Sequence, residues 1–304
     1  MVKSKLLKIF KIVIIILSFW FIGEKFWEHR NWLQTSALNY ELMIVIFTCS
    51  IIYGLSEFLL SFAWRRLLKI CGHKDISTKV CNRIYGKSQI AKYIPGNFFH
   101  VVGRHILGSQ AGIKNIVLAG ATIYEILGLI SVSLIIGFSG MIVFGLNNIY
   151  FSLYQIILIL FSTIVLTSLI TALAPYLMSL RGIVLPHRGL WNTTLNISKV
   201  YVFYFLFFLI AGLLLVIVVN LFTNININIT TKLIVIFSIA WLSGFIIPGA
   251  PGGIGVREAV IIFFITPIIG EAQSIAVAVA LRFITLFGDV WFLIMSDSKF
   301  YLRK

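Results

Sequence analysis

The chain has 304 residues, of which 60% are hydrophobic and only 12% are charged, and its formal net charge is +15. A soluble globular protein has about a quarter charged residues, so the composition excludes that class and indicates an integral membrane protein. No long polar block interrupts residues 1–304, which are therefore predicted to form a single integral-membrane domain without a separate soluble catalytic domain. No basic module with interleaved aromatic residues accompanies the charge, which argues against nucleic-acid binding.

Apolar runs predict an all-α polytopic protein with about eight transmembrane helices, since each crossing needs roughly 20 residues. The first run follows a basic start without a small-residue cleavage site, so we interpret it as a retained span rather than a secretory signal. The first and seventh runs are short for complete crossings. The runs lie at about 9–27, 41–63, 115–145, 151–175, 199–222, 232–247, 254–269 and 272–295.

The distribution of lysine and arginine predicts the orientation of these spans, because cytoplasmic loops carry an excess of both. Residues 65–92 and 181–199 are basic, as are both chain ends. The alternate loops, 24–40, 146–150 and 223–231, are mixed, uncharged or rich in asparagine. Eight crossings of the cell membrane with both termini in the cytoplasm satisfy this pattern.

One basic stretch also has helical periodicity. Lys79, Arg83 and Lys87 recur every four residues, and Val80, Ile84 and Tyr85 lie beside them. This spacing places a basic stripe next to an apolar stripe on one helix. We expect such a helix to lie in the membrane interface and to contact anionic headgroups.

Two later segments resemble each other and predict an internal repeat, with halves at about 41–145 and 199–296. Residues 93–104 read YIPGNFFHVVGR and residues 246–257 read IIPGAPGGIGVR; in each, an arginine follows the proline by nine residues. Proline and glycine break helices, and broken backbone survives in a membrane only inside protein or beside a wet cavity. Paired broken elements therefore predict two re-entrant segments around a transporter site.

The arginines of the two segments, Arg104 and Arg257, are candidate binding residues. A helix that restarts after Pro-Gly presents free N–H groups to an anion, and a guanidinium adds two donors for a phosphate or carboxylate. The alternative interpretation is a structural kink with an arginine that snorkels to the interface.

Further ionisable residues lie within apolar runs, where a charge costs about 2.5–3.5 kcal/mol and usually marks a polar cavity or an ion pair. Alternatives exist for several of them. Glu57 could lie near the end of its span, Glu258 could neutralise Arg257, and Asp289 could pair with Arg282 two helical turns earlier. Glu125 has no cation near it in sequence. The full set is Glu57, Glu125, Glu258, Arg282 and Asp289.

The segments KYIPGNFFHVVGR and PGAPGGIGVREAV resemble the two signature segments of the lysylphosphatidylglycerol synthase transmembrane family. The resemblance covers roughly residues 10–295. It implies a helical bundle with two re-entrant elements around a charged cavity, and a role in moving aminoacylated phospholipids or in handling polyprenyl-linked sugars. The positions carried over are Lys92, Pro95, Gly96, Arg104, Pro248, Gly249, Gly252, Gly253, Gly255, Arg257 and Glu258.

The chain departs from the pattern of that family in two respects. An acid-base pair is expected at Glu125 and its successor, but Ile126 follows Glu125. The aminoacyl-transferase domain of two-domain members is absent from the sequence, so synthesis of lysylphosphatidylglycerol is not implied.

The favoured hypothesis is a lipid translocase that binds an anionic headgroup at Arg104, Arg257 and Arg282. It needs no cofactor and no metal, and its partners are membrane lipids. A cationic aminoacyl headgroup would need Glu57, Glu125 or Glu258, whereas a sugar would need neutral polar and aromatic neighbours.

The alternatives are an integral-membrane glycosyltransferase or hydrolase, and a subunit that recruits enzymes of envelope glycan or lipid synthesis. No nucleophile–base constellation supports an enzyme, so the sequence favours a transporter. The cysteines Cys49, Cys71 and Cys81 match no metal site and are interpreted as free thiols.

Overall fold

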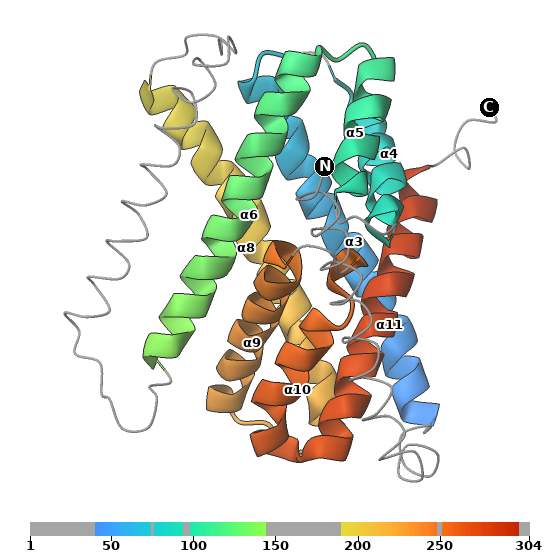
Figure 1. The fold of residues 1–304 in the computed structure, drawn as a ribbon, viewed down its shortest axis with the longest axis vertical. Helices are drawn as coiled ribbons and strands as arrows, with labels where there is room; N and C mark the ends of the chain where they lie inside the picture. Colours follow the sequence, from blue (N-terminus) through green and yellow to red (C-terminus); the bar gives the residue numbers. More distant parts are fainter. Residues whose placement is uncertain (1–39, 74–75, 94–97, 144–189, 248–250, 298–304) are drawn as a thin grey trace, which may run out of the picture.

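The computed structural model describes residues 40–73, 76–93, 98–143, 190–247 and 251–297. These residues form eight α-helices and two short 3-10 helices, and the described part of the chain contains no strand (Figure 1). The all-helical class predicted from the apolar runs is confirmed for these residues.

Five described helices are long and apolar enough to cross a membrane, which makes the chain a multi-pass membrane protein. They are α3 (Tyr40–Ile70), α6 (Asn115–Val143), α8 (Leu190–Asn220), α9 (Ile227–Ile246) and α11 (Glu271–Ser296). The predicted spans at 9–27 and 151–175 lie outside the described residues.

The predicted crossing at 254–269 needs correction. It forms α10 (Val256–Ile269), which has 14 residues. At 1.5 Å per residue this helix is about 21 Å long, whereas the hydrocarbon core is about 30 Å thick. Its length alone therefore excludes α10 as a complete crossing.

Close packing of α3 against α11 forms one side of the bundle. A Cβ atom added to Gly54 would lie 2.7 Å from the carbonyl oxygen of Gly288, and one added to Gly288 would lie 2.5 Å from the ring of Tyr53. Small residues let transmembrane helices approach closely, which favours van der Waals packing where the hydrophobic effect is absent. The aromatic rings of Tyr53, Phe207, Phe208, Trp241 and Phe292 fill the interior behind this contact.

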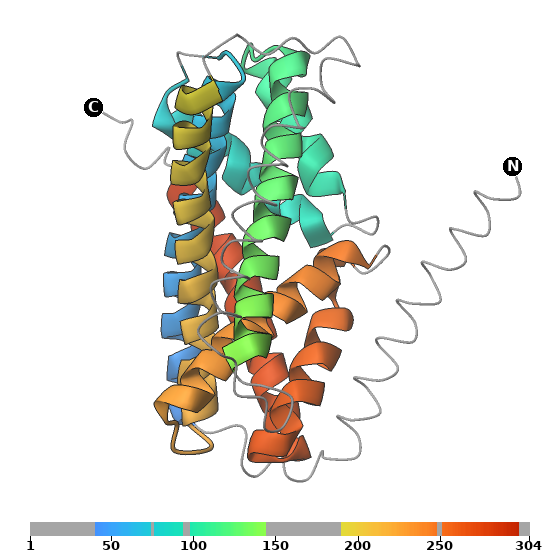
Figure 2. The same cartoon turned by 90° about the vertical axis from the view of Figure 1, so that its left-hand side faces the viewer.

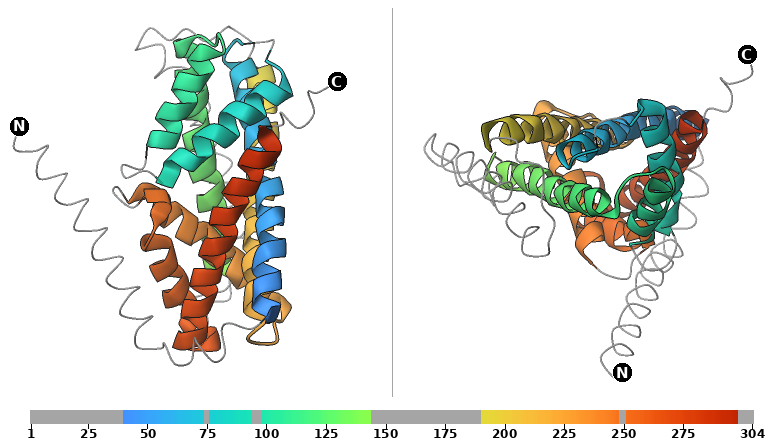
Figure 3. Two further views of the ribbon diagram at one scale, coloured as in Figure 1. Left: turned by 90° about the vertical axis from the view of Figure 1, so that its right-hand side faces the viewer. Right: turned by 90° about the horizontal axis from the view of Figure 1, so that it is seen from above.

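Two helical hairpins meet at mid-height of the bundle (Figures 1 and 3). Hairpin 1 consists of α4 (Thr78–Gln89), η2 (Ile90–Tyr93) and α5 (Phe99–Gln110). Hairpin 2 consists of α9, η3 (Pro251–Gly253) and α10. Figure 2 shows hairpin 1 above hairpin 2 on the same side of the long helices, and η2 contacts η3.

The amphipathic helix predicted around residues 79–87 is α4. Its N-cap is Ser77, whose hydroxyl accepts a hydrogen bond from the Val80 backbone N–H. Ile84 and Tyr85 are buried as the pattern requires and the basic stripe is exposed, but Val80 of the predicted apolar stripe is 41% exposed. Two of the three cations have a protein partner: Arg83 Nε lies 2.7 Å and Lys87 Nζ lies 3.3 Å from Asp297, at the end of α11.

Candidate functional site

Four basic and four acidic side chains gather where the two hairpins meet the long helices. The carboxylates come from α3, α6, α10 and α11, so each lies on a different element. The cations come from η2, α5, α10 and α11. The eight residues are Glu57, Glu125, Glu258, Asp289, Lys92, Arg104, Arg257 and Arg282.

Arg104 and Glu125 form a buried ion pair that joins α5 to α6. Arg104 Nη1 lies 2.5 Å from both carboxylate oxygens of Glu125, and the two side chains are 4% and 7% exposed. The Tyr85 hydroxyl donates to the same carboxylate over 2.7 Å, and Arg104 Nε donates to the Ser88 hydroxyl over 3.2 Å. The guanidinium also lies 3.7 Å above the Tyr85 ring. Glu125 thus has three hydrogen bonds and one neutralising charge inside the protein.

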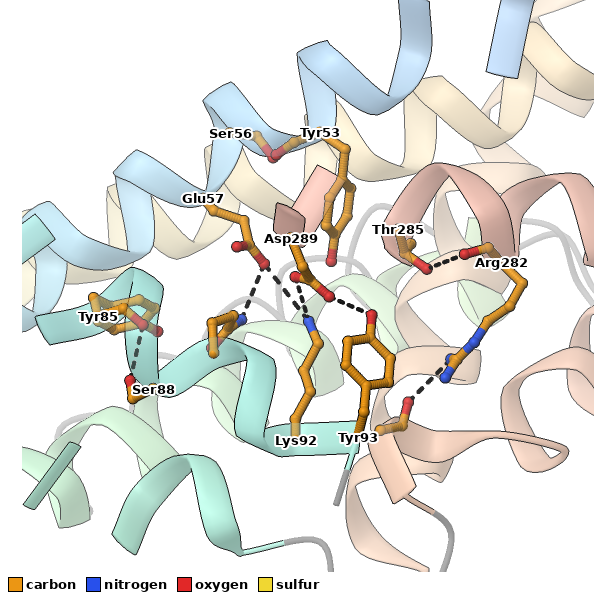
Figure 4. Close-up of polar contacts among 12 residues, drawn as sticks. Tyr53, Ser56, Glu57, Tyr85, Ser88, Lys92, Tyr93, Arg282, Thr285 and Asp289 are labelled. Carbon is orange, nitrogen blue, oxygen red and sulfur yellow. Dashed lines mark hydrogen bonds and ion pairs between the residues drawn. The ribbon is translucent and has the colours of Figure 1, made fainter. Parts of the chain in front are cut away.

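Lys92 joins η2 to two buried carboxylates from different helices (Figure 4). Its Nζ lies 2.6 Å from Asp289 and 3.7 Å from Glu57. The Tyr93 hydroxyl donates a short hydrogen bond to the other oxygen of Asp289, and the Gln89 amide donates to Glu57 Oε1 over 3.0 Å. Hairpin 1 therefore supplies all of these donors, while α3 and α11 supply the acceptors.

Glu258 and Arg282 connect the start of α10 to α11. One Glu258 oxygen accepts the Gly255 backbone N–H over 2.6 Å, and the other lies 3.5 Å from Arg282 Nη1. Arg282 Nη1 also donates to the carbonyl of Gly252 over 3.2 Å, and the guanidinium lies 5.4 Å from the centre of the Tyr93 ring. Arg282 of α11 therefore contacts both hairpins, Gly252 of hairpin 2 and Tyr93 of hairpin 1.

Arg257 differs from the other three cations because no carboxylate of the described residues lies within 4.0 Å of it. Its Nε is buried and has no hydrogen-bond partner in that part of the chain. Its guanidinium lies 5.7 Å from the centre of the Trp241 ring. Added Cβ atoms would lie 2.6 Å from the Arg257 side chain at both Gly244 and Gly253, so two glycines leave the space that this side chain occupies.

A narrow cavity of about 60 Å³ lies between the hairpins. Its polar lining includes Lys92, Arg104, Glu125 and Arg257, and its apolar lining includes the rings of Tyr53, Phe207, Trp241 and Phe245. One buried water fills roughly 30 Å³ of liquid volume, so the cavity is too small for a lipid headgroup in this conformation. The described residues contain no group of three or more side chains that suits a metal ion.

A groove of about 540 Å³ with mixed apolar and polar lining adjoins this cavity. Val101 lines both spaces, and the groove continues along α5 to the start of α6. Its lining includes Val102 and Ile106, which are 47% and 54% exposed. The charged cavity and this surface groove thus meet at Val101 on α5.

The pairing of these residues differs from the alternatives that their spacing suggested. Asp289 contacts Lys92 and Tyr93 rather than Arg282. Glu258 pairs with Arg282 rather than Arg257. Glu57 lies in the interior of α3 rather than at the end of its span, and its side chain is fully buried. Glu125, with no cation near it in sequence, pairs with Arg104 on hairpin 1.

The glycines of hairpin 2 adopt positive φ angles, which glycine permits. Gly252, Gly253 and Gly255 have φ angles of 57°, 75° and 86°, which L side chains rarely adopt. The helix α10 then restarts at Val256. Four motif positions lie outside the described residues: Pro95, Gly96, Pro248 and Gly249.

Several residues of the site were not identified from the sequence, namely Tyr53, Gln89, Tyr93 and Trp241. Gln89 and Tyr93 flank Lys92 immediately before the first Ile-Pro-Gly segment, so their position beside the motif was a usable signal. Tyr53 and Trp241 lie in long apolar runs, where an aromatic residue does not stand out.

The sequence model of one protein family, described as the lysylphosphatidylglycerol synthase TM region, matches residues 8–291. The match includes both hairpins and all eight charged residues of the site. No curated protein and no solved structure matches the chain.

Proposed function

Because the chain belongs to the family of the lysylphosphatidylglycerol synthase TM region, we propose that it translocates lipids with an anionic, phosphate-bearing headgroup across the cell membrane. The observation that carries the proposal is the Arg257 guanidinium, which lines the cavity with its Nε buried and unpartnered. A buried donor without a partner is costly, and a phosphate oxygen would satisfy it.

The other cations support this choice of anion site because each already has a carboxylate partner, although Arg282 Nη2 is also buried without a hydrogen-bond partner among the described residues. Arg104 is paired with Glu125, Lys92 with Asp289, and Arg282 with Glu258. A headgroup phosphate that bound at any of these three would have to compete with a carboxylate. Arg257 offers a planar fork of donors, and no carboxylate of the described residues would have to be displaced from it.

The groove along α5 supports a path for the lipid tails. It exposes the apolar side chains of Val102 and Ile106 beside polar ones of α5 and meets the cavity at Val101. In this proposal the headgroup enters the cavity while the acyl or prenyl chains stay in the bilayer along α5. The small cavity corresponds to a closed state, which opens by separation of the two hairpins.

We further propose that both hairpins are re-entrant elements that enter the membrane from opposite sides. The end of α3 that carries Arg65, Arg66 and Lys69 faces the cytoplasm under the positive-inside rule. Hairpin 1 then starts from the cytoplasmic side and hairpin 2 from the outside, with both chain termini cytoplasmic. The repeat halves at about 41–145 and 199–296 would be related by this inversion, as in other transporters with broken helices.

The test is lipid movement in liposomes that contain purified protein and a fluorescent short-tailed phosphatidylglycerol. Loss of fluorescence on adding a membrane-impermeant quencher reports how much probe has reached the outer leaflet. The wild-type chain should move the probe, and Arg257→Ala should remove most of that activity.

Arg66→Ala is the matched control, since Arg66 is an exposed arginine that lies over Phe203 outside the cavity. It should retain wild-type movement. Full activity in folded Arg257→Ala would show that the arginine only packs against Trp241, and would contradict the proposed site.

A further inference from the structure

The buried carboxylates of Glu57 and Asp289 share a single ammonium group, that of Lys92 on η2 of hairpin 1. The side chains of Glu57 and Asp289 are both 0% exposed, and Lys92 Nζ lies 3.7 Å from the first and 2.6 Å from the second (Figure 4). Two charged carboxylates and one ammonium leave one negative charge in excess. Buried charge without compensation is strongly unfavourable, so this cluster needs either a distant cation or a proton.

The two carboxylates are not equally stabilised. Both oxygens of Asp289 are engaged, one with Lys92 and one with the Tyr93 hydroxyl. Glu57 accepts from Gln89 through Oε1, whereas its buried Oε2 has no partner among the described residues. Hydrogen bonds to a carboxylate stabilise its charged form. Glu57 accepts fewer of them than Asp289 and is therefore the group that takes up a proton.

Charged and titratable groups lie around Glu57 on both hairpins, on α11 and on its own helix, α3. The nearest ones are Lys92 and Asp289, whose distances are given above. Gln89 contributes a neutral amide donor. The others that act on Glu57 or share its surroundings are Tyr53, Tyr85, Tyr93, Arg257 and Arg282.

Arg257 is the one cation of the eight-residue site without a carboxylate within 4.0 Å in the described part of the chain. By count, its charge is the one that offsets the negative charge left in excess by Glu57, Asp289 and Lys92. The whole site is neutral when all four acids and all four bases are charged. An anionic phosphate bound to Arg257 would remove this balance. We infer that the protein binds its anionic headgroup together with a proton and that Glu57 carries this proton, an inference that rests on the proposed function.

The fold provides a means of releasing the proton again. Lys92, Gln89 and Tyr93 belong to hairpin 1, whereas Glu57 and Asp289 belong to α3 and α11. Separation of the hairpins exposes Glu57 to water, which hydrates the carboxylate and accepts its proton. The only bond involved is the O–H bond of the Glu57 carboxyl group, which forms with a proton from water on one side and breaks to return it. The inference therefore assigns proton-coupled lipid movement to this site.

The test measures proton uptake on binding, separately from movement. The probe is short-chain phosphatidylglycerol, added to the detergent-solubilised full chain in a calorimeter. Its phosphodiester does not titrate near neutral pH, so any proton taken up comes to the protein. Binding heats measured in two buffers of different ionisation enthalpy should reveal uptake of up to about one proton per lipid, because one carboxyl group titrates. The affinity should fall as the pH rises.

Glu57→Gln mimics the protonated carboxyl group, so its binding heat should be the same in both buffers and its affinity independent of pH. Glu41→Gln is the matched control, since Glu41 is an exposed acid in the first turn of the same helix. It should behave as the wild-type chain does.

The outcomes separate the two proposals. Binding by the wild-type chain with equal heats in both buffers across the whole pH range would overturn proton coupling and leave the anion site standing. Proton uptake that persists in Glu57→Gln would overturn the assignment to Glu57. Absence of binding by the wild-type chain would overturn the proposed function and the coupling with it.

Discussion

Nη1 of Arg104 lies 2.5 Å from both carboxylate oxygens of Glu125, a residue 21 positions later on the next helix. The pair connects hairpin 1 to α6 at the wall of the cavity. Because both side chains are almost fully buried, each charge depends on the other for its compensation.

Glu125→Gln should therefore lower both lipid movement and stability. Breaking a buried ion pair by removing one partner typically costs about 3–5 kcal/mol, since an uncompensated charge stays behind. Thermal unfolding of the purified variant in detergent measures the loss of stability, and the liposome assay measures lipid movement on an equal amount of folded protein.

A double substitution separates the structural from the functional role of this pair. Arg104→Leu combined with Glu125→Leu leaves no buried charge and should recover most of the lost stability, as replacement of a buried pair by apolar residues often does. If the double variant also moves lipid at the wild-type rate, the pair is structural and neither residue belongs to the binding site.

Cys71, immediately after α3, is expected to be a poorly reactive thiol. Burial raises the pKa of the Cys71 thiol from 9.0 to about 12, and only the thiolate reacts with maleimide. At pH 7 the folded protein should therefore label slowly, and the rate should increase as the pH rises toward 12. Labelling of Cys71 in the folded chain as fast as in denaturant would contradict its buried position.

The slow labelling of native cysteines permits a topology test with added ones. Lys79→Cys on α4 should react with an impermeant maleimide only from the cytoplasmic side, and Ile227→Cys, at the 77% exposed start of α9, only from the outside. Both cysteines reacting from the same side would contradict the opposite entry of the two hairpins.

Local sequence signals predicted the helices but could not specify which charges pair. Apolar runs identify α3, α6, α8, α9 and α11 because each span needs an uninterrupted apolar stretch of defined length. Acidic residues inside these runs pointed to a polar interior for the same reason. Lys92 and Asp289, however, are 197 positions apart, and no local periodicity carries information about such a contact.

The spacing arguments were wrong where a tertiary contact competed with a local one. Asp289 and Arg282 share a helical face, yet each pairs with a residue of another element. The tip of hairpin 1 brings Lys92 to Asp289, and the start of α10 brings Glu258 to Arg282. Similarly, α10 was predicted as a crossing from its apolar composition, although the glycines at 252, 253 and 255 leave it only 14 residues.

The shape of the Arg257 side chain should matter as much as its charge. Arg257→Lys keeps a positive charge but replaces a planar fork of donors with a single ammonium group. If the guanidinium binds two phosphate oxygens, this variant should move phosphatidylglycerol more slowly than the wild-type chain and faster than Arg257→Ala. Equal rates for Arg257→Lys and the wild-type chain would mean that charge alone is sufficient.

The last prediction concerns the position of that guanidinium rather than its chemistry. Gly253 has a φ of 75°, and an added Cβ would lie 2.6 Å from Arg257 Nε. Gly253→Ala therefore introduces a left-handed non-glycine residue, at a cost of roughly 1–2 kcal/mol, and also displaces the guanidinium. Gly112→Ala is a matched control, because Gly112 has a φ of 81° but no atom lies within 4 Å of an added Cβ. Both variants should lose similar stability in thermal unfolding, whereas only Gly253→Ala should slow lipid movement. If the two variants move lipid equally well, the position of Arg257 against Gly253 does not contribute to binding, and the anion must be held elsewhere in the cavity.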